Sequence, residues 1–408
     1  GQTAIAPNTN AAIENASGDF CVFLDHDDLL AQHALYEIAR CVSENNDLKL
    51  IYSDEDKLND IGQRLDPHFK PDWNPDLLLS QNYICHLVAI DRGVLEKTGG
   101  CRAGYEGAQD HDLLLRVMSE ITADQVRHIP KILYHWRMAE GSTAAAASAK
   151  SYSTDSGVAA VQDYLHSVGA DARVESGKYP NTYRVCWTLP ESKPLVSIII
   201  PTRDRLGILS QCVSSVLART TYQNYEIIVV DNESVEPETH AYFEEIRQHP
   251  KIRVILYRGD FNFSAINNFA VEHAHGSVIT MMNNDIEVIS ESWLNAMLEH
   301  IQQEKVGAVG AKLLYPDDTV QHAGIVVGIY GVAENAHKYV PKEEHGYENR
   351  VDLIQNLSAC TAACLLIKKT VFEQVNGLDD VNFKVNFNDV DLCLKIRELG
   401  FNIVYTPY

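Results

Sequence analysis

Two segments far apart in the chain share one sequence pattern, and this repeat limits the folds that the chain can adopt. The segment "NAAIENASGDFCVFLDHDD" (residues 10–28) aligns without a gap with "NFAVEHAHGSVITMMNNDI" (residues 268–286). Each copy reads as a short helix, a glycine that ends it, and an apolar strand that ends in acidic residues. The identical pairs are Asn10 and Asn268, Ala12 and Ala270, Glu14 and Glu272, Ala16 and Ala274, Gly18 and Gly276, and Asp27 and Asp285. The match predicts two copies of one structural unit.

A second pair of segments repeats in the same order. "GGCRAGYEGAQDHDLLLRV" (residues 99–117) resembles "NGLDDVNFKVNFNDVDLCLKI" (residues 376–396). Both begin with a glycine turn and end in Asp-x-Asp-Leu, followed by a helix with apolar residues at helical spacing. We therefore expect a first domain over residues 1–145, a connector with a helix and short strands over residues 146–193, and a second domain over residues 194–408.

Composition and charge are those of an ordinary globular protein, and they exclude some partners. The 408 residues are 45% apolar and 22% charged, which is enough for two cores. The net charge of −22 argues against a nucleic-acid partner, because a polyanion is bound by clustered Lys and Arg. The apolar runs are strand-sized, below the roughly 18–20 residues of a membrane span. With scattered cysteines and no visible signal peptide, we expect a cytoplasmic protein.

Strands in the second half end in polar residues. "PLVSIIIPTRDR" and "YEIIVVDNES" each read as a buried strand followed by a turn, and strands that alternate with helices predict an α/β sheet. Ligands of such sheets bind beyond the carboxyl ends of the strands. We therefore expect Thr202, Asp204, Asp231 and Asp285 to line one crevice.

The cluster "DHDD" at the end of the first apolar strand predicts a metal site. Asp25 and Asp27 project to the same side if the chain is extended. Two carboxylates can hold Mg²⁺ or Mn²⁺, and the metal would bind a diphosphate and neutralise a leaving group. Solvated turn acids, a calcium loop and a phosphatase with an Asp nucleophile are the alternatives. The recurrence at Asp285 favours the metal site.

Acidic residues also start the later helix of each copy. Free backbone N–H groups and the helix dipole hold a carboxylate at a helix start, so these acids are N-caps or proton acceptors. We predict that Asp110 and Asp389 are bases and that Asp112 and Asp391 cap or pack. His135, in the apolar stretch "LYHWR", is either a structural residue or a ligand.

Together these segments resemble two glycosyltransferase domains of family 2, which has the GT-A fold. In the first half the resemblance rests on "SGDFCVFLDHDD", "IYSDEDK", "FKPDWNPDLLLSQNYICHL", "EGAQDHDLLLRV" and "HIPKILYHWR". In the second half it rests on "VSIIIPTRDR", "VVDNES", "FNFSAINNFA", "MMNNDIEV", "VGAKLLYPDDTVQHAG" and "FNDVDLCLKIRELGFNIVYTPY". The pair is similar to bacterial tandem transferases of the rhamnosyltransferase type, which build O-antigen and related surface polysaccharides. It implies an α/β fold of two GT-A (nucleotide-diphospho-sugar transferase, Rossmann-like) domains in tandem.

The same resemblance implies an inverting reaction with a nucleotide-sugar donor and Mn²⁺ or Mg²⁺. The acceptor would be a hydroxyl of a growing, lipid-linked glycan at the inner face of the membrane, where a peripheral contact with lipid fits. By resemblance, the bases are Asp110 and Asp389, the metal ligands are Asp27, His135 and Asp285, and the nucleotide-sugar contacts are Asp25, Thr202, Asp204, Asp231 and Asn283.

Three departures from the family pattern limit this reading. The first copy begins at "GQTAIAPNTN", without the opening strand and its nucleotide-contacting Asp. The second copy stops before its own histidine, and Asn283 stands where the first Asp of the pair is expected. We therefore expect the chain to be a fragment in which neither copy holds a full site. Two alternatives stay open: one catalytic domain beside a degenerate glycan-binding or scaffolding domain, and a non-catalytic sugar-binding protein.

Overall fold

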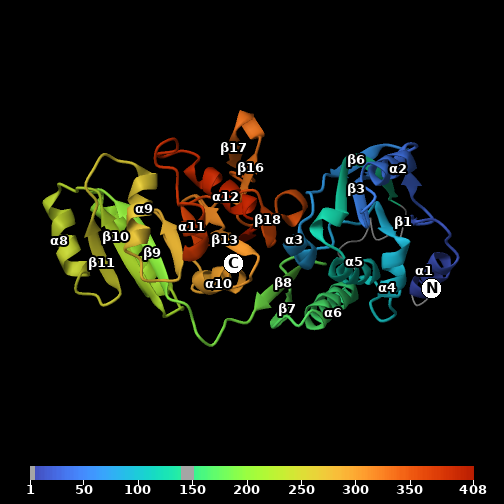
Figure 1. Ribbon diagram of the computed structural model, residues 1–408, viewed down its shortest axis with the longest axis horizontal. Helices are drawn as coiled ribbons and strands as arrows, with labels where there is room; N and C mark the ends of the chain where they lie inside the picture. Colours follow the sequence, from blue (N-terminus) through green and yellow to red (C-terminus); the bar gives the residue numbers. More distant parts are fainter. Residues whose placement is uncertain (1–4, 139–150) are drawn as a thin grey trace. The chain divides into compact units, whose positions relative to one another are not determined.

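The chain forms two compact units, Gly1–Cys186 and Trp187–Tyr408. The computed structural model describes residues 5–138 and 151–408, and Figure 1 colours the first unit from blue to green and the second from green to red. Helices and strands alternate in both units, so the predicted α/β fold is confirmed. Within the described ranges, no helix combines the length and the apolar character that crossing a bilayer requires.

The first unit is built on a mixed sheet with the order β1-β5-β3-β6-β2, and β4 pairs with β3. Its strands are β1 (Phe20–Phe23), β2 (Leu29–Leu30), β3 (Leu50–Leu58), β4 (Arg64–His68), β5 (Val88–Asp91), β6 (Val126–Arg137), β7 (Ala172–Ser176) and β8 (Tyr183–Trp187). Its helices are α1 (Ile5–Glu14), α2 (Ala34–Glu44), α3 (Pro75–Ser80), α4 (Arg92–Thr98), α5 (Gln109–Glu120) and α6 (Ser151–Ser167). Ile38 and Cys41 of α2 pack on Ile51, Ala89 and Leu133 of the sheet.

The expected connector is part of the first unit. The predicted helix and two short strands are present as α6, β7 and β8, and residues 146–150 lie outside the described residues. The hydroxyl of Tyr105 donates to Asp163 of α6, and the ring of Tyr183 stacks on His111 of α5 with centroids 5.4 Å apart. These contacts join α6 and β8 to α5 and the loop before it, and the compact unit extends to Cys186 rather than ending at residue 145.

The second unit is built on an eight-stranded sheet with the order β11-β10-β9-β12-β19-β13-β20-β18. The sheet strands are β9 (Val196–Thr202), β10 (Tyr225–Asp231), β11 (Ile252–Leu256), β12 (Val278–Met282), β13 (Val306–Ala311), β18 (Gln355–Leu357), β19 (Cys364–Lys368) and β20 (Asn402–Thr406). Smaller pairs are β14 (Leu313–Leu314) with β15 (Val320–His322), and β16 (Ile325–Val327) with β17 (Ala333–Asn335). The helices are α7 (Leu206–Arg219), α8 (Pro237–Ile246), α9 (Phe263–Glu272), α10 (Trp293–Ile301), α11 (Lys369–Gln374) and α12 (Asn388–Glu398).

Both faces of this sheet are covered. Ile198 and Ile200 of β9 belong to a core with residues of α7 and α10, whereas Ile199 belongs to a core with residues of α9 and α12. Successive side chains of a strand point to opposite faces, so a strand buried on both faces has a continuous apolar sequence. This explains the run "VSIII", and it leaves the polar residues to follow at the strand ends.

Four strands of each sheet pair in the same order and directions. β1 is antiparallel to β5, β5 is antiparallel to β3, and β3 is parallel to β6. β12, β19, β13 and β20 repeat these relations. The register also agrees: Phe20 lies opposite Asp91, and Val278, its partner in the sequence alignment, lies opposite Lys368. In both sheets a helix begins at the next residue, α4 or α11.

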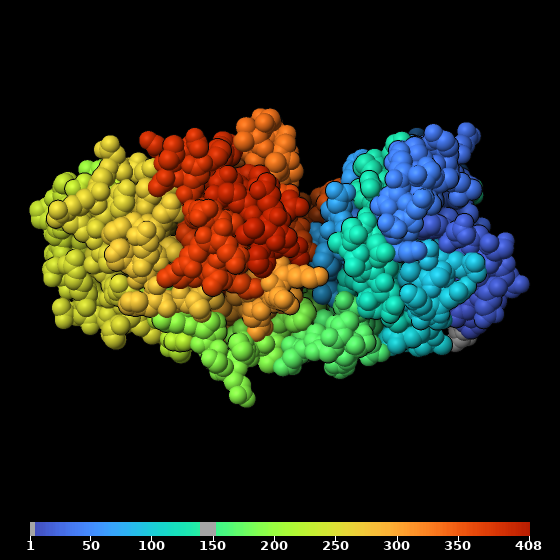
Figure 2. Space-filling model, in the orientation of Figure 1, coloured from blue at the N-terminus to red at the C-terminus, as the bar shows by residue number. Residues whose placement is uncertain are grey.

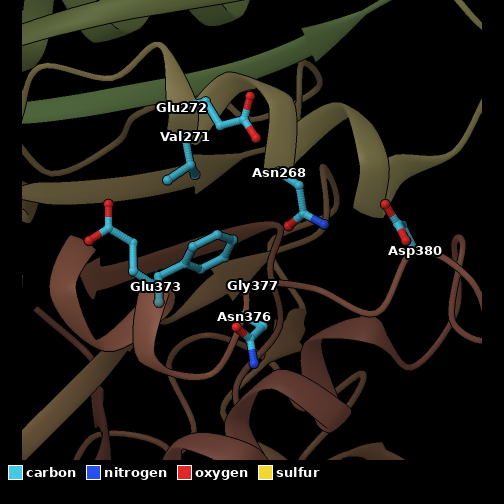
Figure 3. Close-up of a pocket in the computed structure, with 8 residues that line it drawn as sticks. Asn268, Val271, Glu272, Glu373, Asn376, Gly377 and Asp380 are labelled. Carbon is cyan, nitrogen blue, oxygen red and sulfur yellow. The ribbon is translucent and has the colours of Figure 1, made fainter.

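An asparagine in each unit fastens a helix to a glycine turn. Asn268 of α9 donates from Nδ2 to the carbonyl of Leu378 (2.9 Å) and accepts from its N–H (2.9 Å). Asn10 of α1 makes the same two bonds to Cys101, both 2.8 Å. Figure 3 shows Asn268 facing the turn that contains Gly377, where an added Cβ would lie 2.6 Å from Oδ1 of the asparagine. The repeated asparagine and the repeated glycine turn therefore form the same pair of hydrogen bonds in both units.

The glycines before the acidic strands do not end the helices. The cap residue of α9 is His273, and Gly276 follows three residues later without a positive φ. A Cβ at Gly276 would lie 2.5 Å from the carbonyl oxygen of Leu195, and its N–H donates to Oγ of Ser197 (2.8 Å). The prediction of a helix-ending glycine is therefore wrong, because Gly276 instead permits a close approach to β9.

We predict that Asn268→Ala lowers the free energy of unfolding by about 2 kcal/mol, because two half-buried backbone groups lose their partners. Urea unfolding of the full chain measures this change. The control is Glu373→Ala, which removes an exposed side chain of α11 and should change stability by less than about 0.5 kcal/mol. Equal stabilities of Asn268→Ala and the wild type would contradict the role of the asparagine.

Candidate functional site

The predicted nucleotide-contacting residues of the second unit lie at the carboxyl ends of neighbouring strands. Thr202 ends β9 and Asp231 ends β10, and the two residues are partners in the parallel register. Asn284, in the turn after β12, donates from Nδ2 to Oγ1 of Thr202 (3.0 Å). The ends of β9, β10 and β12 are therefore joined at one edge of the sheet, where open α/β sheets bind ligands.

Asp204 shapes this edge through its loop. Its Oδ1 accepts from the N–H groups of Glu236 (2.9 Å) and Val235 (2.8 Å), and the bond from Glu236 is the main cause of its lowered pKa. The N–H of Asp204 donates to Oγ of Ser234 (2.9 Å), and the N–H of Ser234 donates to Oδ1 of Asp231 (2.8 Å). These bonds fasten the loops after β9 and β10 to each other.

Asp389 lies in the first turn of α12, beside the turn that precedes β19. Its Oδ2 accepts from the N–H of Ala362 (3.2 Å). In the same turn, the carbonyl of Ala363 accepts from the N–H of Asn283 (3.0 Å), the residue directly after β12. One turn therefore joins the predicted base of the second unit to the strand end that carries Asn283 and Asp285.

A buried histidine supports that turn, and sequence reasoning assigned it no role. Nδ1 of His322 lies 2.6 Å from Oδ1 of Asn335, and Nε2 accepts from the N–H groups of Gly324 (3.3 Å) and Thr361 (3.4 Å). The neutral tautomer with its proton on Nδ1 satisfies all three contacts. Burial lowers the pKa of His322 to about 4, although the bond to Asn335 opposes this shift. The neutral ring therefore holds the residue next to Ala362.

The acidic cluster of the first unit forms a turn. The N–H of Asp28 donates to the carbonyl of Asp25 (3.2 Å), so the prediction that Asp25 and Asp27 project to one side of an extended chain is wrong. Asp28 is buried and accepts from the hydroxyl of Tyr134 (2.5 Å) and from the N–H of Arg137 (2.8 Å). These hydrogen bonds hold Asp28 inside the fold, whereas Asp25 and Asp27 stay exposed.

Asp110, in the first turn of α5, interacts with Asp25 and His86. Burial raises the pKa of Asp110, the charge of His86 lowers it, and the charge of Asp25 raises it. The ring of His86 stacks on Tyr134 with centroids 4.8 Å apart, and the N–H of Asp25 donates to the hydroxyl of Tyr134 (3.3 Å). The structure therefore brings together Asp110, the predicted base, and Asp25, a predicted contact of the nucleotide-sugar. It adds His86, to which the sequence analysis assigned no role.

A buried ion pair holds the segment that carries His86. Nζ of Lys70 lies 3.7 Å from Oε2 of Glu55 and donates to the carbonyls of Ile84 (2.8 Å) and His86. The same carboxylate accepts from the N–H of His86. An unpaired charge in the interior is costly, so the pair fixes this backbone in place. The run of acids in "YSDEDK", within an otherwise apolar strand, was the available signal.

His135 lies on β6 opposite Leu29 of β2. Leu29 follows Asp27 by two residues. Nδ1 of His135 lies 2.5 Å from Oδ1 of Asp56, a buried carboxylate that also pairs with Arg64. An imidazole held at Nδ1 by a carboxylate keeps Nε2 for another contact. Within the described residues, no three His, Cys, Asp or Glu side chains lie close enough to hold one metal ion.

The second acid of each Asp-x-Asp-Leu sequence packs rather than caps. Asp112 pairs with Arg116 (2.7 Å) and with Arg102, and Asp391 pairs with Lys395 (3.0 Å). The N-cap residues of the two helices make no side-chain cap bond. Of the two alternatives left open by the sequence, the packing role is therefore the one observed.

A pocket of the second unit is lined by other residues. It has a volume of about 320 Å³ and lies between α9, α11 and the glycine turn (Figure 3). It is lined by Asn268, Val271, Glu272, Phe372, Glu373, Asn376, Gly377 and Asp380. No predicted site residue lines it, and its carboxylates disfavour an anionic donor.

Comparison with known families finds a match within the second unit. Residues 197–375 match the family described as "Glycosyl transferase family 2". The matched range includes the strand ends of β9, β10 and β12. This finding agrees with the resemblance noted in the sequence.

Two longer proteins are similar to nearly the whole chain. "Uncharacterized protein y4gI" of Sinorhizobium fredii is 46% identical over 402 residues, which are 98% of this chain and 44% of that protein. "O-antigen biosynthesis protein RfbC" of Myxococcus xanthus is 39% identical over 407 residues, which are 100% of this chain and 31% of that protein. The chain thus spans less than half the length of either relative.

A solved structure of the mannosyltransferase PcManGT from Pyrobaculum calidifontis, in complex with GDP-Man and Mn²⁺, is also similar. The likeness covers 53% of this chain and 56% of that one, with 17% identity and a TM-score of 0.40. No functional conclusion follows from a likeness of this size.

We predict that stability falls as the pH drops from 6.5 to 4, partly through His322. The folded protein keeps this ring neutral down to about pH 4, whereas the unfolded chain takes up the proton near pH 6.5. Protonation of His322 in the unfolded chain lowers the free energy of unfolding by about 3 kcal/mol once it is complete. Urea unfolding between pH 4 and 7 should therefore show a shallower pH dependence for His322→Asn than for the wild type, and identical slopes would contradict a neutral ring.

Proposed function

We propose that the chain is part of an inverting, metal-dependent glycosyltransferase that adds a sugar to a bacterial surface polysaccharide such as O-antigen. The family 2 match over residues 197–375 carries this proposal. The 39% identity to an O-antigen biosynthesis protein, over the whole length of this chain, supports the polysaccharide product. A rhamnosyl donor and a lipid-linked acceptor at the inner face of the plasma membrane are the finer parts of the proposal.

The reaction assigns different tasks to the acidic strand end after β12 and to the start of α12. Asp389 takes the proton of the acceptor hydroxyl. The acceptor oxygen then bonds to the anomeric carbon as the bond from that carbon to the donor diphosphate breaks, and the nucleoside diphosphate leaves with the electron pair. Because attack and departure occur on opposite sides of the carbon, the configuration inverts. The N–H of Ala362 donates to Oδ2 of Asp389 and the N–H of Val390 donates to Oδ1, so both bonds orient the carboxylate. Each oxygen keeps a second lone pair for the acceptor hydroxyl.

The available donor atoms fit Mn²⁺ or Mg²⁺ held together with a diphosphate. Asp285 and Asp27 are exposed carboxylates directly beyond a strand, and Mg²⁺ commonly binds one or two carboxylates plus substrate phosphates. In the first unit, His135 is oriented by Asp56 as metal-bound histidines commonly are. When bound, the metal would neutralise the leaving diphosphate.

A tandem arrangement of two GT-A units is part of the proposal. The shared strand order, the equal register of the β1–β5 and β12–β19 pairs and the repeated asparagine bonds support it. Asp110 then takes the role of Asp389 in the first unit. We predict that Thr202, Asp204 and Asp231, at the strand ends of the second unit and in the loop after β9, contact the nucleotide.

A second candidate keeps one catalytic unit beside a degenerate glycan-binding or scaffolding unit. Asn283 favours it, because an amide occupies the position of Asp25 and gives the second unit fewer charged ligands. The raised pKa of Asp110 supports an active first unit, since a base whose pKa lies nearer the working pH accepts protons more effectively.

We predict that Asp389→Asn lowers sugar transfer by about 10²- to 10⁴-fold, because the amide cannot accept the proton of the acceptor. Asp110→Asn should do the same for any linkage made by the first unit. The measurement is product formation by the full-length protein with Mn²⁺ and a panel of UDP-, dTDP- and GDP-sugars. Asp391→Asn is the control, since it alters a neighbouring acid that is paired with Lys395. Unchanged transfer in both base variants would remove the assignment.

We also predict that Mn²⁺ and nucleoside diphosphate bind cooperatively. Calorimetric titration of Mn²⁺ into the chain with UDP, dTDP or GDP present should show at least tenfold weaker binding for Asp285→Asn. Glu272→Gln, which alters an exposed carboxylate of the other pocket, should leave the affinity unchanged. Metal binding that is indifferent to both nucleotide and Asp285 would contradict the proposal. Two sites of equal affinity would argue against a degenerate unit.

A further inference from the structure

The loop before Asp389 exposes apolar side chains beside the predicted base. In the segment 379–387, Val381 is 74% exposed, Val385 47% and Phe387 40%. Phe387 precedes Asp389 by two residues and is the N-cap of α12. Figure 2 shows that the C-terminal part of the second unit, coloured red, reaches the surface on the face in view. Three exposed apolar side chains within one stretch of seven residues make this loop a candidate binding surface.

Polar groups alternate with the apolar side chains of this loop. Lys384 and Asn386 are exposed, and within the described residues neither side chain has a hydrogen bond or an ion pair. The surface therefore offers an aromatic ring, an ammonium group and an amide within four residues. A pyranose ring has the matching chemistry, because one face presents C–H groups and its edge presents hydroxyls. An acyl chain would leave the ammonium and the amide unused.

The corresponding loop of the first unit has the opposite chemistry. Residues 102–107 contain no large exposed apolar side chain, and they are two residues fewer than residues 379–386. Arg102 pairs with Asp112, and the counterpart of Phe387 is Ala108, which is buried with a φ of −136°. The apolar surface is therefore a feature of the second unit and not a consequence of the repeated fold.

The loop backbone is held from both ends. Asn262, the N-cap of α9, donates to the carbonyl of Asp380 (2.8 Å). Ser264 donates from Oγ to the carbonyl of Phe383 (2.5 Å) and from its N–H to that of Lys384 (3.2 Å). The amide of Asn388 donates to the same Oγ (3.1 Å). A surface presented by a fixed backbone loses little conformational entropy on binding.

Phe387 keeps a strained backbone conformation. Its φ of 60° lies in the left-handed region, which a bulky residue adopts only at a cost in free energy. The ring is not buried, so core packing does not repay this strain. Strained residues of this kind gather at functional sites.

From these observations we infer that segment 384–387 binds a pyranose ring of the acceptor, with its C–H face on Phe387 and its hydroxyls on Asn386 and Lys384. The electron-rich ring face attracts the positively polarised C–H groups. The inference rests on the proposed function and deepens it, because it names the acceptor subsite of the second unit.

Saturation-transfer NMR on the full chain tests the subsite without turnover. The probes are methyl α-rhamnoside, methyl α-mannoside and methyl β-glucoside, and we expect ring C–H signals from at least one of them. Phe387→Gly should reduce these signals at least fivefold and yet raise the urea midpoint, because glycine adopts a positive φ without strain. Phe387→Tyr should retain the signals. Leu399→Ala, at the other end of α12 and similarly exposed, should leave them unchanged.

Three results would overturn the inference. They are the absence of ring signals with all three glycosides, equal signals in Phe387→Gly and wild type, and a lower urea midpoint in Phe387→Gly, which would indicate a purely structural ring. Binding of phosphatidylcholine vesicles that depends on Phe387, with no glycoside signal, would show a lipid surface instead. The Mn²⁺ and nucleotide titration is independent, so failure there removes the proposed function and leaves the glycoside result readable.

Discussion

The account depends on one pairing constraint, the antiparallel register that sets β12 against β19 in the second unit and β1 against β5 in the first. This register fixes where the chain turns before the antiparallel strand. In the second unit, the carbonyl of Ala363 in this turn accepts from the N–H of Asn283, and the N–H of Ala362 donates to Asp389. A shift by one residue would send every side chain of the strand to the other face and separate the acidic strand end from the acidic helix. The chemistry is therefore positioned by backbone pairing, and side chains refine it.

The turn before the antiparallel strand is supported by different side chains in the two units. The first unit uses a buried Lys70–Glu55 pair that binds the backbone around His86. The second unit uses neutral His322, which binds the N–H of Thr361. A buried ion pair and a neutral imidazole both leave few polar atoms unsatisfied, but they differ in their response to acid. The repeat thus preserves geometry while the surrounding chemistry diverges, and the loops before Asp110 and Asp389 diverge further.

Much of the fold followed from the sequence because its signals are local or periodic. The ungapped match of residues 10–28 with 268–286 predicted the helix and strand of each copy, and the apolar run of β9 predicted a buried strand of an α/β sheet. The turn that replaces an extended chain at Asp25 was missed, since a strand pattern does not report where pairing stops. His86 and Lys70 were missed because their roles arise from backbone contacts between segments distant in sequence. Gly276 was misread for the same reason: its constraint is the neighbouring strand β9.

The most direct test of the central claim is paramagnetic NMR of the full chain with Mn²⁺ and a nucleoside diphosphate. A metal held at the strand end of the second unit should broaden the amide signals of Asn284, Asp285 and Ala362 strongly. It should leave the turn of Asn376 and Gly377, beside the other pocket, sharp. Broadening confined to that pocket, or spread evenly over the acidic surface, would contradict a site built by the β12–β19 register and the start of α12.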